Sequence, residues 1–260
     1  MKYGLINRNL VDLWIKPQYN SERVNQAFFC EPVKIISKRK GYLRLTLSDH
    51  YDGWVRENFV TEISYSRYKA HLAGSTYFVN HKEAKLVDKN KKAVEPYFLY
   101  YGTRLIAKKA KDGYHKIISP SGENLYIRST VLNKISSKDG LLKYPDAAKR
   151  FLGTPYLWGG ISPAGFDCSG LVHTILKKYG INFPRDTKDQ IKKGRKIAKD
   201  NIQRGDLLFF KRHIAIALSK TRFIHCSIGN NGVFINSFNP SDDNYHKQLD
   251  NDFQLARRIL

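Results

Sequence analysis

The 260-residue sequence contains only three cysteines, Cys30, Cys168 and Cys226. A number this small and odd cannot form a disulfide framework, and no C-x-x-C spacing indicates a zinc or redox motif. No His/Asp/Cys cluster has the spacing of metal ligands either, so we expect no metal and no cofactor. Cys30 and Cys226 lie in apolar, strand-like segments, AFFCEPV and RFIHCS, and we expect both to be buried.

The sequence also lacks long apolar runs. No window approaches the ~18–20 consecutive apolar residues that a membrane-spanning helix needs. The first dozen residues contain Asn7, Arg8, Asn9 and Asp12, where a secretory signal would be apolar. We therefore expect a cytoplasmic protein without a membrane span. A periplasmic or exported location is the alternative if a signal has been removed.

Acidic residues are scarce, since 23 Asp and Glu oppose 45 Lys and Arg and give a formal net charge of +22. Such a surface attracts anionic partners over long distances. The basic residues are spread along the chain, with no arginine-rich block and no aromatic RNA-binding motif, so we expect no specific binding of nucleic acid. The alternative is that the charge serves mainly solubility.

Residues 1–135 alternate short apolar runs with turn residues, a pattern typical of small β-barrels. In residues 1–63 the runs are VDLWI, AFFCEPVKIIS, GYLRLTLS and DGWVRENFV. In residues 64–135 the segments GYHKII and NLYIRSTVL repeat GYLRLTL and GWVRENFV in order and spacing. We predict two successive barrels, 1–63 and 64–135. The segment SYSRYKAHLA fits either a short helix or a linker.

A third domain is predicted over residues 136–260, after a Ser-, Gly- and charge-rich linker at 136–144. Apolar residues recur at helical spacing from Cys168 to Gly180, which predicts an amphipathic helix that begins at the cysteine. Five later apolar runs predict an antiparallel sheet: 207–210, 214–218, 222–226, 233–237 and 255–259. A helix followed by such a sheet places the domain in the α+β class.

Cys168 stands in the first turn of the predicted helix, within the segment DCSGLV. A helix amino terminus carries roughly half a positive charge, so a sulfur placed there is biased toward the reactive thiolate. His213 and His225 follow on predicted neighbouring strands and can supply a base and its orienting group. His173 lies on the predicted solvent side of the helix and is expected to have no chemical role. This order suggests a cysteine hydrolase.

Five separated segments surround these residues in the order GTPYLWGGISPAGFDCSGLV, FPRDTKDQ, RGDLLFF, HIAIALS and RFIHCS. Together they closely resemble the NlpC-type, papain-like peptidoglycan endopeptidases over roughly residues 145–260. The segment GYLRLTLSDHYDGWV resembles the strand–turn–strand of bacterial SH3 modules. The resemblance implies two SH3-like barrels and a papain-like domain, in which the helix that carries the cysteine packs on the antiparallel sheet.

The resemblance also implies the roles of the catalytic residues. Cys168 is the expected nucleophile, His213 its base, and His225 the residue that fixes the tautomer of that base. The backbone N–H of Cys168 and the hydroxyl of Tyr156 are expected to bind the oxyanion. The alternative for Tyr156 is a packing aromatic. Trp158, in the same loop, is expected to form a wall of the cleft.

Polar residues near the nucleophile are expected to bind the substrate. In the SH3-bearing branch of the family, this is the stem peptide L-Ala-γ-D-Glu-diamino acid, cleaved after the D-Glu. Asp186 matches the position that binds the free amine of the L-Ala, while Ser169 and Thr187, where the branch more often has Ser, can bind the α-carboxylate. Arg185 is expected to contact substrate or to pair with Asp186. The predicted contacts in this domain are Asp167, Trp158, Ser169, Arg185, Asp186 and Thr187.

The first SH3 module is expected to close one end of the cleft, with Glu57 and Tyr77 as candidate contacts. A closed cleft admits only free murein stem peptides, which predicts a recycling enzyme, and the third residue of the peptide, Lys or diaminopimelate, stays open. One alternative is an exported hydrolase that acts on intact wall. Its SH3 modules, and the binding of its basic surface to an anionic cell-wall polymer, would hold it there. Another is a wall-binding protein with a spent hydrolase domain, against which Cys168, His213 and His225 argue.

Overall fold

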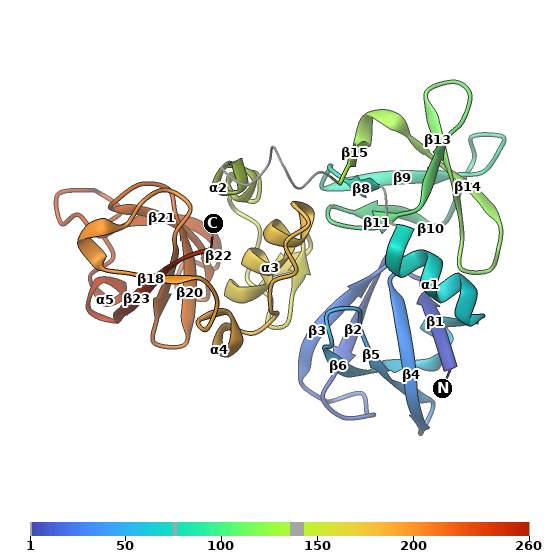
Figure 1. Ribbon diagram of the computed structural model, residues 1–260, viewed down its shortest axis with the longest axis horizontal. Helices are drawn as coiled ribbons and strands as arrows, with labels where there is room; N and C mark the ends of the chain where they lie inside the picture. Colours follow the sequence, from blue (N-terminus) through green and yellow to red (C-terminus); the bar gives the residue numbers. More distant parts are fainter. Residues whose placement is uncertain (1, 75–76, 136–142, 260) are drawn as a thin grey trace. The chain divides into compact units, whose positions relative to one another are not determined.

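The computed structural model describes residues 2–74, 77–135 and 143–259 (Figure 1). The chain forms two compact units, unit 1 over residues 1–135 and unit 2 over residues 136–260. Most of the predicted linker at 136–144 lies outside the described residues. Within the described ranges, no helix is long and apolar enough to cross a membrane.

The first part of unit 1 is one antiparallel sheet of seven strands in the order β3-β2-β6-β5-β4-β1-β7. Its strands are β1 (Lys2–Ile6), β2 (Leu10–Trp14), β3 (Arg23–Phe28), β4 (Pro32–Arg39), β5 (Tyr42–Thr46), β6 (Asp52–Arg56) and β7 (Val60–Ile63). Alternate residues face a common core, as Val11 and Leu13 do in β2. Position 53 requires glycine because a Cβ there would lie 2.7 Å from the Cβ of Leu13. The four predicted apolar runs form β2 to β7, and β1 is a strand that the sequence did not predict.

The second part of unit 1 begins with α1 (Tyr65–Gly74), so the ambiguous segment is a helix, and it packs on β1 and β4 (Figure 1). Two sheets follow, in the orders β11-β8-β15 and β10-β9-β14-β13-β12. Their strands are β8 (Tyr77–Val79), β9 (Glu83–Val87), β10 (Ala93–Tyr100), β11 (Arg104–Leu105), β12 (Ala107–Lys109), β13 (Tyr114–Ile118), β14 (Asn124–Arg128) and β15 (Leu132–Lys134). The repeated segments form β13 and β14. Their likeness to an SH3 module stays a prediction.

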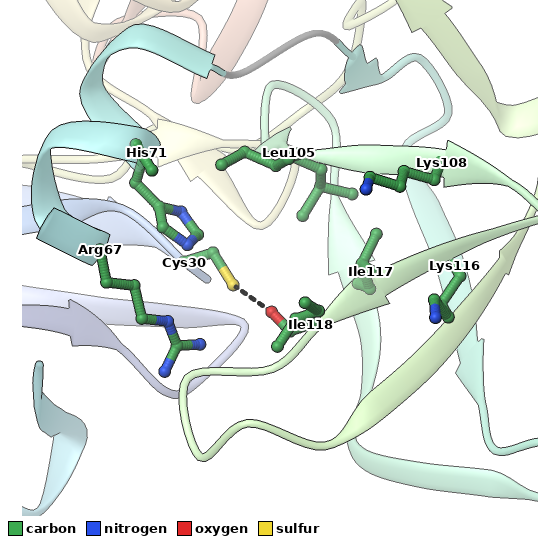
Figure 2. A pocket seen from close by; sticks show the side chains of 10 residues that line it. Cys30, Arg67, His71, Leu105, Lys108, Lys116, Ile117 and Ile118 are labelled. Carbon is green, nitrogen blue, oxygen red and sulfur yellow. Dashed lines mark hydrogen bonds between the residues drawn. The ribbon is translucent and has the colours of Figure 1, made fainter.

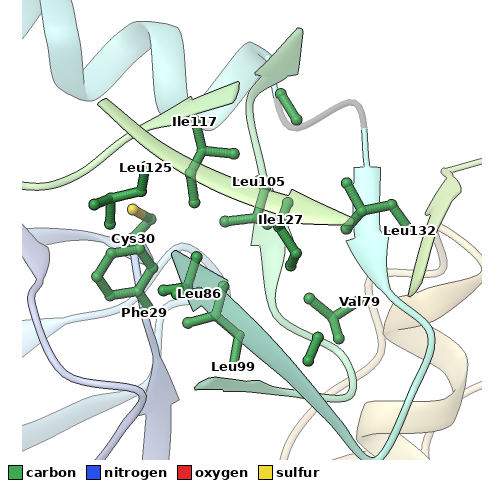
Figure 3. Close-up of a cluster of buried hydrophobic side chains, with 12 residues drawn as sticks. Phe29, Cys30, Val79, Leu86, Leu99, Leu105, Ile117, Leu125, Ile127 and Leu132 are labelled. Atoms are coloured by element: carbon green, nitrogen blue, oxygen red, sulfur yellow. The ribbon is translucent and has the colours of Figure 1, made fainter. Parts of the chain in front are cut away.

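The core of this second part includes two residues from the first. Phe29 and Cys30, in the turn between β3 and β4, are buried together with Leu86, Leu99 and Ile127 (Figure 3). Both parts therefore share apolar surface that neither could bury alone, which accounts for unit 1 behaving as one compact body.

A cavity of about 240 Å³ lies beside this shared core, between α1, β12 and β13 (Figure 2). Cys30 lines it and directs its thiol toward the carbonyl oxygen of Ile118, at 3.9 Å. Burial raises the pKa of the Cys30 thiol far above its usual range. The cysteine is therefore an unreactive apolar residue, as its sequence context predicts.

Unit 2 contains an antiparallel sheet in the order β18-β23-β19-β20-β21-β22. Its strands are β18 (Arg195–Ile197), β19 (Leu207–Phe210), β20 (His213–Ala217), β21 (Arg222–Ser227), β22 (Gly232–Ser237) and β23 (Phe253–Arg258). The other elements are α2 (Tyr144–Lys149), β16 (Ile161–Ser162), β17 (Gly165–Phe166), α3 (Cys168–Lys178), α4 (Thr187–Gln190) and α5 (Lys247–Asn251). The five predicted strands are all present. The sixth, β18, is short and largely exposed, and it carries little apolar signal.

α3 begins at Cys168, as predicted, and packs against β20 and β21. The predicted solvent exposure of His173 is wrong, because this residue is only 2% exposed. The chain that follows α3 folds back over the helix, and Nδ1 of His173 is 2.8 Å from the carbonyl oxygen of Phe183. α3 is thus covered on every side along most of its length.

We expect Ile127→Ala to destabilise the second part of unit 1 by about 2–5 kcal/mol, because Ile127 is fully buried and its truncation leaves a cavity. Hydrogen–deuterium exchange of peptides from residues 77–134 measures the local free energy of opening. Ile118→Ala is the matched control, since Ile118 is 51% exposed and should change that free energy by no more than about 0.5 kcal/mol. Equal effects of the two changes would contradict this picture of the core.

Candidate active site

The start of α3 is fixed by the carboxylate of Asp167. Its Oδ1 accepts a hydrogen bond from the N–H of Gly170 at 2.6 Å, as an N-cap residue does. Its Oδ2 accepts one from the N–H of Gly159 at 2.9 Å. Position 170 requires glycine because a Cβ there would lie 2.0 Å from the carbonyl oxygen of Gly160. The loop before the helix and the first turn that carries Cys168 are therefore held against each other.

Arg185 forms a buried ion pair with this carboxylate. Its Nη1 and Nη2 donate to Oδ1 and Oδ2 of Asp167 at 3.0 and 2.6 Å, and the two residues are 3% and 6% exposed. Nη1 also donates to Oγ of Ser169 at 2.8 Å, and that hydroxyl donates to Asp167 at 3.1 Å. Gln190 extends the network by donating to the carbonyl of Ser169. Two parallel hydrogen bonds between a guanidinium and a carboxylate fix both the distance and the orientation of the two side chains.

This network gives structural partners to three predicted substrate contacts, Asp167, Ser169 and Arg185. Arg185 forms an ion pair with Asp167, eighteen residues earlier in the chain, which the sequence did not predict. Asp186 and Thr187 are half-buried at the start of α4, next to this network. Contact of these residues with substrate stays a prediction.

The thiol of Cys168 lies in an environment that favours its neutral form. Burial raises its pKa to about 11, and the Asp167 carboxylate acts in the same direction. The backbone N–H groups of Ile214 and Ser169 and the charge of Arg185 favour the thiolate but do not outweigh these effects. The helix start therefore acts on the thiol in the predicted direction, but burial outweighs it in the free protein. The thiol needs a base to remove its proton during the reaction.

His213 and His225 come together across neighbouring strands. The antiparallel register of β20 and β21 pairs Ile216 with Ile224, which makes the two histidines diagonal neighbours on one face. His213 Nε2 lies 2.7 Å from His225 Nδ1. Burial lowers the pKa of His213 to about 3 and that of His225 to about 4. Both rings are neutral at pH 7, so His213 can accept a proton.

His213 is also placed next to the nucleophile. It is the first residue of β20, and the N–H of the next residue, Ile214, is hydrogen-bonded to the sulfur of Cys168. Tyr156 lies nearby as well, since burial and then the neighbouring Cys168 and Asp167 raise the pKa of its phenol well above its usual range. The phenol keeps its proton and can donate a hydrogen bond. Trp158, in the same loop, is 57% exposed.

The other residues named from the sequence have partners of their own in the structure. Glu57 and Tyr77 belong to unit 1, where Glu57 pairs with Lys38 and the ring of Tyr77 packs on that of His115. Their contact with substrate stays a prediction. Cys226 is fully buried, and its thiol donates to the carbonyl of Phe166 at 3.0 Å. The described residues contain no group of His, Cys, Asp and Glu side chains that could hold a metal ion.

Asn236 is a residue of the site that sequence reasoning missed. It lies on β22, is 6% exposed, and its Oδ1 is 2.8 Å from Nε2 of His225. The register of β21 and β22 pairs Asn236 with Phe223, so it is a diagonal neighbour of His225. The sequence does contain a signal for this role, because Asn236 lies inside the apolar segment GVFINS, and a buried asparagine side chain needs a hydrogen-bond partner.

We expect Arg185→Met to lower the free energy of unfolding of unit 2 by about 3–5 kcal/mol, because the Asp167 carboxylate would stay buried without its countercharge. Urea denaturation followed by Trp158 fluorescence, in a Trp14→Phe/Trp54→Phe background, measures this change. Lys192→Met is the control, since it breaks an exposed ion pair with Asp189 and should cost no more than about 1 kcal/mol. Similar losses in both variants would rule out a special role for the buried pair.

Comparison with known proteins places this site in a family. Residues 153–249 match the model of the NlpC/P60 family. The murein DD-endopeptidase MepS/murein LD-carboxypeptidase of Escherichia coli is 32% identical over 134 residues, which cover 49% of this chain and 68% of that protein. The gamma-D-glutamyl-L-lysine dipeptidyl-peptidase of Bacillus cereus is 26% identical over 239 residues, covering 82% and 69%. A crystal structure of an NlpC/P60 family protein from Bacillus cereus shares the fold with a TM-score of 0.83, 22% identity and 99% coverage of both chains. The chain belongs to the NlpC/P60 family of cysteine peptidases.

Proposed function

We propose that the protein is a peptidoglycan peptidase that hydrolyses the γ-D-glutamyl-diamino acid bond of free murein stem peptides. The observation that carries the proposal is the hydrogen bond between His213 and His225, on the neighbouring strands β20 and β21, beside the contact of Ile214 with the Cys168 sulfur. The name of the Bacillus cereus relative supports the bond and the substrate class. Recycling of wall peptides in the cytoplasm is the setting that we propose.

In the proposed reaction, His213 takes the proton of the Cys168 thiol as the sulfur attacks the γ-carbonyl carbon of the D-Glu. The backbone N–H of Cys168 and the hydroxyl of Tyr156 bind the oxyanion that forms. The C–N bond then breaks, and His213 gives its proton to the leaving amine of the diamino acid. Water, activated by the neutral His213, hydrolyses the thioester and restores the thiol.

Substrate recognition is proposed to rest on the segment that joins Arg185 to α4. The carboxylate of Asp186 binds the free amine of the L-Ala, an interaction that an acylated or longer peptide cannot make. The hydroxyl proton of Ser169 is directed at Asp167, whereas Thr187 makes no side-chain hydrogen bond within the described residues. Thr187 is therefore the better donor for the α-carboxylate of the D-Glu.

Mass spectrometry of the purified protein with three substrates tests this function. We expect cleavage of L-Ala-γ-D-Glu-diaminopimelate, or of its Lys form, between the D-Glu and the diamino acid, and no cleavage of the amino-acetylated peptide or of intact sacculi. Cleavage of sacculi at a similar rate would favour the exported wall hydrolase, to which the +22 charge would bind anionic wall polymer. No cleavage of any substrate would reject the proposal.

Asp186→Asn tests the proposed recognition of the free amine in the same assay. It should lower kcat/KM for the free peptide about 10- to 100-fold, the worth of a hydrogen bond to a charged group. Asp189→Asn, on the same short helix but with an exposed side chain, should leave kcat/KM unchanged. If the acetylated peptide is cleaved as fast as the free one, Asp186 does not read the amine.

We expect Cys168→Ala to abolish peptide cleavage, with a loss of at least ~10³-fold, because no other residue can form the thioester. Cys226→Ala should retain activity and lose stability, because this thiol is buried and bonded to the Phe166 carbonyl. The same mass-spectrometric assay and a thermal unfolding curve separate the two effects. Turnover by the Cys168 variant would overturn the mechanism.

A further inference from the structure

His225 is the hydrogen-bond partner of His213. A carboxylate or an amide oxygen in its place could only accept a hydrogen bond from His213, whereas an imidazole can either accept or donate one. A neutral imidazole has two tautomers, and each makes one ring nitrogen a donor and the other an acceptor. If His225 carried its proton on Nδ1, it would donate to Nε2 of His213. His213 would then carry its own proton on Nδ1, and the nitrogen that must receive the thiol proton would be blocked.

We propose that Asn236 is a positioning residue that sets the tautomer of His225 and, through it, that of His213. The inference rests on the proposed roles of Cys168 and His213 as nucleophile and base, and it does not depend on which peptide is cleaved. Asn236 touches neither the sulfur nor the substrate in this scheme. It acts through the side chain of His225, 2.8 Å away.

The orientation of the Asn236 amide follows from a partner that cannot change its own role. Nδ2 of Asn236 donates to the backbone carbonyl oxygen of Asn244 at 3.0 Å, and a carbonyl oxygen can only accept. Oδ1 must therefore face the other way, toward His225, where it also accepts from Nδ2 of Asn230 at 2.7 Å. A flipped amide would place two acceptors against each other at Asn244, inside a buried site.

The proton positions then follow one after another. Oδ1 of Asn236 only accepts, and at 2.8 Å it is closer to Nε2 of His225 than Nδ2 of Asn230 is at 3.3 Å, so Nε2 carries a proton. Because the buried ring is neutral at pH 7, Nδ1 of His225 holds a lone pair and accepts from Nε2 of His213 at 2.7 Å. The neutral His213 ring is thereby left with a lone pair on Nδ1. Two further titratable side chains lie beside the pair: Cys168, and His246, whose ring centroid is 6.4 Å from that of His225.

The reverse arrangement would be costly for catalysis. In a serine protease triad, replacement of the orienting carboxylate that leaves the histidine in the wrong tautomer lowers kcat by about 10⁴. Here the buried Asn236 oxygen excludes that arrangement, because a His225 ring protonated on Nδ1 would turn a lone pair toward the lone pairs of Oδ1. The peptidase thus uses a neutral chain of side chains where other enzymes use a charge.

Asn236→Leu and Asn236→Asp test the proposal together. Leucine has the same branching at Cγ but no acceptor, so kcat should fall about 10- to 100-fold with little change in KM. Aspartate restores the acceptor and should bring kcat back to within about tenfold of the wild type. Its negative charge favours the protonated imidazoles and raises the pKa of His225 and His213, so the acid limb of kcat/KM should move to higher pH. A merely structural role would lower activity without moving that limb.

Nitrogen NMR of protein labelled with ¹⁵N-histidine reads the tautomers directly and needs no substrate. We expect Nε2–H on both His225 and His213 in the wild type, and loss of this uniform pattern in Asn236→Leu. Asn251→Leu, at an exposed position of α5, is the matched control and should change neither the spectrum nor kcat.

Each outcome decides the proposal separately from the proposed function. A proton on Nδ1 of either histidine in the wild type would overturn it, as would an unchanged spectrum in Asn236→Leu. If the NMR result holds but no murein peptide is cleaved, the substrate assignment fails and the positioning role of Asn236 stands. If murein peptides are cleaved and Asn236→Leu keeps its kcat, the positioning role fails alone.

Discussion

The buried ion pair between Asp167 and Arg185 is the interaction on which the rest of the active site depends. The carboxylate caps α3, holds the glycine-rich loop through Gly159, and is bridged to Ser169. Arg185 connects the same carboxylate to the segment that leads into α4. Buried ion pairs often add little net stability, but breaking one is expensive. Its value here is geometric, since three segments that surround Cys168 meet at one side chain.

The position of that carboxylate has a cost for the chemistry. It lies beside the nucleophile and, together with burial, raises the pKa of Cys168 to about 11, while Arg185 offsets part of the effect. The same low-dielectric surroundings lower the pKa of His213 to about 3. The resting pair is therefore a neutral thiol beside a neutral imidazole. Charge separation is deferred to the step in which oxyanion donors and bound substrate can stabilise it.

The sequence alone predicted those parts of the structure that depend on local pattern. Short apolar runs located β19 to β23, and the twelve-residue spacing of His213 and His225 matched a hairpin that makes them neighbours. Contacts between distant loops left no such signal, so the partner of Arg185 and the burial of His173 were not predicted. The neutral state of the Cys168 thiol was not predicted for the same reason, because burial is a property of the whole fold.

His213, His225 and Asn236 form a hydrogen-bonded chain of neutral side chains, with no buried charge behind the base. A carboxylate behind the base would hold its tautomer and raise its pKa, but it would need compensation in an interior where Asp167 is already paired. A neutral chain needs no countercharge and leaves His213 with a low pKa. It must instead specify a direction for every proton. The backbone carbonyl oxygen of Asn244 sets that direction, because it can only accept a hydrogen bond and so fixes the orientation of the Asn236 amide.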